Sequence, residues 1–173
     1  MTTTQLANAV QIFDSRLVTL EHLLKAGIAW FGEPEATYFQ RRLAHDMLPL
    51  GTQIAFTCNQ PRNFSLWLNG APSNDFDPTV KSMELAQTYI AESRALLSQH
   101  NEVQGMLPAT KHLSLGPGLH ADLTGEEYLS EFLMPNFYFH LVTSYDILRA
   151  SGVPLGKRDY MFHFLPKVTQ STI

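Results

Sequence analysis

The chain has 173 residues, which suits one domain with a substantial hydrophobic core, and we predict a single domain over residues 1–173. A formal net charge of −4 and the lack of a Lys/Arg cluster argue against nucleic acid or an anionic membrane as the main partner. One cysteine excludes an internal disulfide and a cysteine-based zinc framework.

The first predicted helix carries the clearest periodic signal. Its apolar residues recur in steps of four and three, at Leu6, Val10, Phe13, Leu17, Leu20, Leu24 and Ile28. This spacing puts them on one face, as in a helix of a bundle. The sequence shows neither a signal peptide nor 18 consecutive uncharged apolar residues, so we expect a soluble protein of the cytoplasm.

A second helix is predicted from about His45 to Leu68, with Pro49 in its first turn and Pro61 as a place where it kinks or divides. Cys58 follows an apolar run and is predicted to be a buried, inert thiol. A third helix is predicted from Asp77 to about residue 100, with Asp77 as its N-cap.

Alternating residues on both sides of a Gly-Pro-Gly turn, residues 116–118, predict a small two-stranded excursion. The last long helix is predicted from Thr124 to Gly152. Thr124 and Glu127 form a capping-box pattern, and Pro135 should kink or split this helix. Four long helices predict an all-α four-helix bundle with a hairpin-like excursion before the last long helix.

The last predicted helix also carries an unusual polar pair. Asn136 and His140 lie one turn apart on a face that is otherwise apolar. Polar side chains that point inward need hydrogen-bond partners, so this pair marks the candidate site.

Several segments resemble the signatures of one bacterial family: Arg42–Leu50, Pro135–His140, Tyr145–Arg149 and Gly156–Tyr160. The family is an uncharacterised branch of the DinB/YfiT-like superfamily of proposed metalloenzymes, known only as a domain of unknown function. The resemblance implies an up-down-down-up four-helix bundle, often dimeric, with a pocket at one end. In metal-binding relatives three histidines hold a divalent ion there, and some relatives are thiol-dependent transferases or isomerases.

This sequence departs from the three-histidine pattern that the resemblance implies. The matching positions read Asp46, Asn136 and His140, with His45 beside Asp46 and Ser144 one turn after His140 as further pocket residues. Asparagine is a weak neutral ligand, so we expect no cofactor, or at most a loosely held zinc, nickel or iron ion.

Three interpretations of these residues stay open. Asp46 could accept a hydrogen bond from His140 in a buried network, the two could form a catalytic pair, or the trio could coordinate a metal. The favoured function is a small-molecule binding or interaction module with a degenerate metal site. The alternatives are a metal-dependent or Asp–His-dependent enzyme acting on a small thiol or thiol adduct, and a structural homodimer that uses the apolar tail after Gly152. Whether the protein is an enzyme is left open.

The remaining histidines have simpler interpretations. His112 and His120 flank the glycine turn and are predicted to lie on the surface near a pocket mouth. His163 lies in the apolar tail, where packing or an interface explains it.

Overall fold

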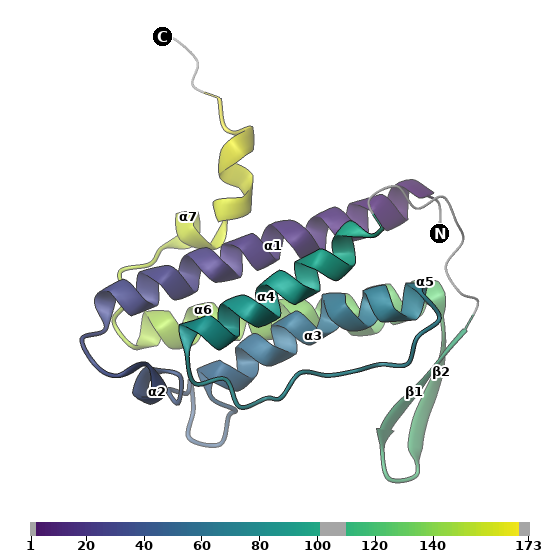
Figure 1. Ribbon diagram of the computed structural model, residues 1–173, viewed down its shortest axis with the longest axis horizontal. Coiled ribbons are helices and arrows are strands. Elements are labelled where there is room, and N and C mark those ends of the chain that lie inside the picture. Colours follow the sequence, from purple (N-terminus) through teal and green to yellow (C-terminus); the bar gives the residue numbers. More distant parts are fainter. Residues whose placement is uncertain (1–2, 101–109, 170–173) are drawn as a thin grey trace.

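Four long helices lie side by side in the computed structural model, which describes residues 3–100 and 110–169 (Figure 1). They are α1 (Thr3–Trp30), α3 (Leu50–Leu68), α4 (Met83–Ser98) and α6 (Met134–Ala150). The predicted all-α bundle is therefore confirmed. None of the helices in these described residues is long and apolar enough to cross a membrane.

The core lies where the predicted apolar face of α1 meets the other helices. Six of the seven residues predicted for that face are buried: Leu6, Val10, Phe13, Leu17, Leu20 and Leu24. The ring of Phe13 lies 5.5 Å from that of Phe64 on α3 and 5.0 Å, edge to face, from that of Phe137 on α6. Such aromatic contacts add to the gain from burial, and here they join three helices at one point.

Helix α3 begins later than the sequence predicted. Pro49 is its N-cap and Leu50 its first residue, so the predicted start at His45 is wrong. A proline disfavours helical backbone in the residue before it, which explains why the helix does not extend back past Pro49. Pro61 does not divide α3, which runs unbroken through this residue. Cys58 is buried, as predicted.

A short α2 (Glu35–Tyr38) lies between α1 and α3, and an extended segment leads from α3 to α4. This segment approaches α3 closely at Gly51, where a Cβ atom would lie 2.1 Å from the Val80 carbonyl oxygen. Helix α4 begins at Met83 with Ser82 as its N-cap, not at Asp77. Asp77 instead accepts a hydrogen bond from the Thr79 amide, which closes a turn before the helix.

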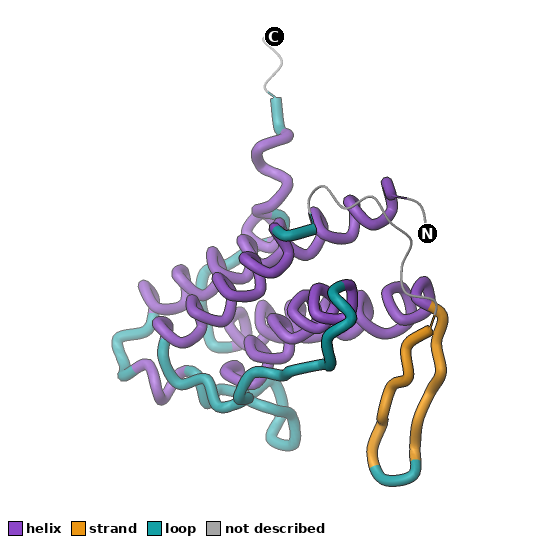
Figure 2. The backbone as a smooth tube through the Cα atoms, turned by 45° about the vertical axis from the view of Figure 1, so that its right-hand side comes forward, coloured by secondary structure: helices purple, strands orange, loops and turns teal. Residues whose placement is uncertain are grey.

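The predicted two-stranded excursion is confirmed. Strands β1 (Thr110–Gly116) and β2 (Leu119–Thr124) form an antiparallel hairpin that stands off the helices (Figure 2). Its turn uses Gly116 and Gly118 with φ angles of 121° and 74°, a region that side chains rarely adopt.

The last predicted helix forms in three sections. After the capping box of Thr124 and Glu127, α5 (Gly125–Glu127) leads into a π-helical turn, η1 (Tyr128–Leu133), and then into α6. The wide turn ends just before Pro135, which has no N–H and cannot continue a regular ladder. The irregularity predicted from Pro135 is therefore present, as a π turn rather than a simple kink.

The tail after α6 folds back onto α1 through α7 (Lys157–Tyr160) and a 3-10 helix, η2 (Phe162–Lys167). His22 on α1 lies 3.0 Å from Asp159 and stacks on the ring of Phe162. The His163 amide of η2 also donates to the Thr19 hydroxyl of α1 at 3.3 Å, and beyond it the chain projects away from the bundle (Figure 1).

Candidate functional site

A cavity of about 500 Å³ lies between α3, the η1–α6 helix and the hairpin. The three rings of Phe56, Tyr128 and Phe132 form its apolar part. Asn136 and His140 line it as well, so the structure brings these two predicted residues to one site. A cavity of this size is typical of small-molecule sites.

His140 is held by a chain of two hydrogen bonds. Its Nδ1 lies 2.8 Å from Oε1 of Gln53, and Nε2 of Gln53 donates to the Leu48 carbonyl at 3.1 Å. Because a carbonyl can only accept, the amide of Gln53 must turn its oxygen towards His140. Nδ1 of His140 is therefore the donor, and Nε2 is left as an unprotonated acceptor nitrogen.

Burial keeps this imidazole neutral. It lowers the pKa of His140 to about 4, because no nearby acid compensates the cost of desolvating the charged ring. The ring also lies edge to face with Phe56 and Phe139, at centroid distances of 5.1 and 5.2 Å. At neutral pH His140 thus offers one lone pair in a largely apolar setting.

Asn136 has a partly structural role. Its Nδ2 donates to the Phe132 carbonyl at 2.7 Å, one turn back in the π-helical section. The side chain thereby supports the wide turn that leads into α6. Its amide nitrogen is engaged by the helix itself.

The predicted pair of Asp46 and His140 does not form. Asp46 lies in the loop before α3 with its side chain 75% exposed, next to His45, which is 97% exposed. Neither residue lines the cavity. The reason is the late start of α3 at Pro49, which leaves both residues outside the helix, and Gln53 takes the position opposite His140.

Ser144 does not line the cavity either. It is fully buried, and its hydroxyl donates to the His140 backbone carbonyl at 2.8 Å. Its prediction as a pocket residue was wrong because α6 turns it into the core. Its contact stabilises the turn that carries His140.

The residues around His140 do not fit the three-ligand metal centre that the resemblance implied. A closed or catalytic centre needs at least three protein donors, and zinc favours histidine, thiolate and carboxylate. Within residues 3–100 and 110–169, no three His, Cys, Asp or Glu side chains converge in a way that could hold an ion. The neighbours of His140 are amides instead: Gln53 accepts from Nδ1, and Asn136 binds a backbone carbonyl.

Charged groups at the rim of the cavity already have partners. Asp75 accepts from Nδ2 of Asn63 at 2.7 Å, and Lys111 donates to the Ser73 hydroxyl at 3.2 Å while lying over the Tyr128 ring. One acid and one base line the same rim, so the cavity shows no bias towards an anion or a cation.

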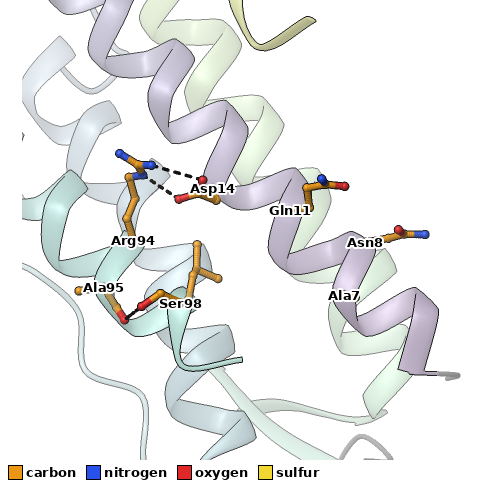
Figure 3. A pocket seen from close by; sticks show the side chains of 8 residues that line it. Ala7, Asn8, Gln11, Asp14, Arg94, Ala95 and Ser98 are labelled. Atoms are coloured by element: carbon orange, nitrogen blue, oxygen red, sulfur yellow. Dashed lines mark hydrogen bonds and ion pairs between the residues drawn. The ribbon is translucent and has the colours of Figure 1, made fainter. Parts of the chain in front are cut away.

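A larger cavity of about 630 Å³ lies between α1 and α4, but its chemistry is less distinctive (Figure 3). Its charged residues bind each other: Arg94 donates to both carboxylate oxygens of Asp14, at 2.7 and 3.4 Å. Asn8 and Gln11 project away from α4 in this view. Among the described residues that line this space, no titratable group is without a partner, so the cavity around His140 is the stronger candidate.

Gln53 is the main residue of the site that the sequence analysis missed. The signal was present: once Pro49 is taken as the N-cap, Gln53 lies in the first turns of α3 and next to apolar residues such as Ile54 and Ala55, where its long amide side chain is buried. A glutamine that is buried in such a position needs partners on both ends of its amide.

Comparisons with known proteins identify the family and the fold. The family model described as a domain of unknown function, DUF1993, matches residues 7–161. The chain is similar to the crystal structure of a DinB family member protein from Shewanella denitrificans, with 26% identity, a TM-score of 0.72 and coverage of 92% of this chain and 93% of that one. No curated protein matches the sequence significantly. The chain therefore belongs to the DUF1993 family of unknown function and has a DinB-like fold.

Proposed function

We propose that this protein binds a small uncharged organic molecule in the cavity between α3, η1–α6 and the hairpin. The ligand would have an aromatic or aliphatic body and one hydrogen-bond donor, such as a hydroxyl, an N–H or a thiol. The single observation that carries this proposal is the neutral His140, whose Nδ1 is fixed by Gln53 so that Nε2 is an acceptor. The rings of Phe56, Tyr128 and Phe132 supply the apolar contact.

The low pKa of His140 favours binding over acid–base catalysis. A general base works best when its pKa lies near the working pH, and a pKa of about 4 makes His140 a weak base at pH 7. No carboxylate stands behind the ring to stabilise an imidazolium, because its partner is the amide of Gln53. Ligand binding is therefore better supported than an enzyme that deprotonates a thiol.

The proposal can be tested with matched small probes. Benzyl alcohol and benzyl mercaptan carry a donor, whereas toluene has the same ring without one. We expect both donor probes to shift the NMR signals of Phe56, Phe132 and His140 at lower concentration than toluene does. In His140→Phe, the preference for the donor probes over toluene should disappear.

The control is Gln11→Ala, which alters the other cavity and should leave the preference unchanged. Shifts that cluster around Arg94 and Asp14 instead of His140 would overturn the proposal. So would a donor preference that persists in His140→Phe.

We also propose that His140 holds no metal. Purified protein should lose no zinc, nickel or iron when His140 is changed to Ala, as measured by elemental analysis of both proteins. The amide neighbours of His140 support this proposal. A stoichiometric ion that disappears in His140→Ala would contradict it.

Self-association through the tail is a second candidate role. Phe164 is 49% exposed and Val168 57% exposed on a segment that projects from the bundle, and exposed apolar groups of this kind favour a partner surface (Figure 1). We propose a homodimer in which η2 contacts a second copy. Phe164→Asp should give monomers by light scattering, whereas Leu115→Asp, on the equally exposed hairpin tip, should not. An unchanged oligomeric state in Phe164→Asp would exclude η2 as the interface.

A further inference from the structure

The hairpin gathers four polar side chains on one face. The strand register pairs His112 with Asp122 and Ser114 with His120. Because side chains alternate between the two faces of a strand, residues at positions 112, 114, 120 and 122 share a face. His112 and His120 are diagonal neighbours on it, within reach of each other across the strands.

The two imidazole rings lie next to each other at a tilt, on exposed side chains. Their centroids are 5.2 Å apart with an angle of 33° between the planes. Nδ1 of His112 lies 2.7 Å from Oδ1 of Asp122, and the side chains of His112 and Asp122 are 66% and 60% exposed. Because Nδ1 faces Asp122, the Nε2 atom of His112 is the ring nitrogen left for another partner.

We propose that the exposed face of the hairpin that carries positions 112, 114, 120 and 122 binds a divalent transition-metal ion, of the Zn²⁺ or Cu²⁺ type, through His112 and His120. Nε2 of His112 and one ring nitrogen of His120 would be the protein ligands, and water would fill the other positions. Asp122 would not bind the ion but would hold the His112 ring through Nδ1, as carboxylates commonly do for metal-bound histidines. Imidazole suits both ions.

The spacing of the rings fits this geometry. With a metal–nitrogen distance of about 2.0–2.1 Å and a tetrahedral angle, two bound imidazoles have centroids roughly 5 Å apart. The observed separation of 5.2 Å needs little adjustment. Two histidines with water form an open site, weaker than a centre with three or four protein ligands.

The ion would join the two strands of an element that has little support of its own. A two-stranded hairpin is marginal in water, and this one stands off the bundle (Figure 2). Four residues of β1 line the cavity around His140, and one of them is the proposed ligand His112: Lys111, His112, Leu113 and Ser114. Metal binding would therefore order one wall of that cavity, although the metal site itself does not depend on what the cavity binds.

The test is a titration of the metal-stripped full chain, free of any histidine tag, with Zn²⁺ at pH 7.5 by calorimetry. We expect one ion per chain. His112→Ala and His120→Ala should each weaken binding at least about tenfold, and Asp122→Asn about tenfold through loss of ring orientation. His45→Ala removes an exposed histidine outside the hairpin and should change nothing.

A second measurement locates the ion independently of affinity. Substoichiometric Cu²⁺ should broaden the NMR signals of His112 and His120 first and leave those of His45 and His140 sharp. Unchanged Zn²⁺ affinity in His120→Ala would overturn the proposal. Broadening that starts at any other histidine would also overturn it. If Asp122→Asn alone has no effect, the orienting role of Asp122 is wrong.

Discussion

The two histidine sites of this protein differ in the partner that holds the ring. Nδ1 of His140, in the bundle, donates a hydrogen bond to the amide oxygen of Gln53. His112, on the hairpin, instead faces the carboxylate of Asp122. A buried ion pair must overcome a large desolvation cost, but an exposed one is solvated throughout. The buried site thus uses a neutral partner and stays uncharged, and only the exposed site can keep an acid beside its histidine.

The largest effect on stability should come from removing the amide of Gln53, the neutral partner of His140. Gln53→Leu leaves Nδ1 of His140 and the Leu48 carbonyl without their bonds, and it should lower the free energy of unfolding by about 1–3 kcal/mol. Urea denaturation measures this. Gln60→Leu is the control, because the amide nitrogen of Gln60 donates to a carbonyl of its own helix, that of Phe56, and its loss should lower the free energy of unfolding by less. Equal losses would mean that the contact with His140 adds nothing.

Gln53→Glu makes the buried site resemble the exposed one. A carboxylate next to Nδ1 favours the charged ring, so the pKa of His140 should rise from about 4 by about one to two units. NMR titration of the His140 ring signals measures the shift. No rise would show that solvation, and not the choice of partner, sets the charge of this histidine.

The wild-type protein should lose stability in acid because of His140. Its pKa in the folded state is below the unfolded value of about 6.5, so the unfolded chain takes up the proton first as the pH falls. The loss should begin near pH 6.5 and be complete near pH 4. Allowing for partial exposure of the ring, we expect it to reach about 1–2 kcal/mol. In His140→Gln this part of the pH dependence of urea denaturation should be missing.

The smallest effect should come from the exposed pair in the absence of metal. Asp122→Asn should change the free energy of unfolding by less than about 0.5 kcal/mol, since exposed ion pairs contribute little. If Asp122→Asn lowered the free energy of unfolding as much as Gln53→Leu does, the partners of the exposed and the buried histidine would not differ in their contribution to stability.

The sequence predicted those features that depend on near neighbours. Thr124 and Glu127 are three residues apart and form their capping box, and the glycines at 116 and 118 turn the hairpin. The position of Asp46 depended instead on where α3 begins, and the effect of Pro49 on the preceding backbone decided that. Starting the helix at His45 instead of Leu50 placed Asp46 inside it and directed its side chain towards His140, where Gln53 lies instead.

The contact between His112 and Asp122 was missed for a different reason. The turn residues were recognised, but the register was not used to ask which side chains face each other. A shift by one residue would put these two on opposite faces, so only the observed pairing brings them together. The histidines themselves were correctly expected on the surface near the cavity.

The π-helical turn η1 sets the rotational phase of the long helix. Tyr128, Phe132, Asn136 and His140 follow one another at intervals of four, which would drift around a regular α-helix by roughly 40° per step. The wider turn takes up part of that drift, so all four can face one cavity. If Tyr128–Leu133 formed a regular α-helix without losing a residue, the three steps from Tyr128 to His140 would add up to a rotation of roughly 120°, and the aromatic wall would face away from His140. The alignment of the cavity therefore depends on the length of this turn as much as on the residues that line it.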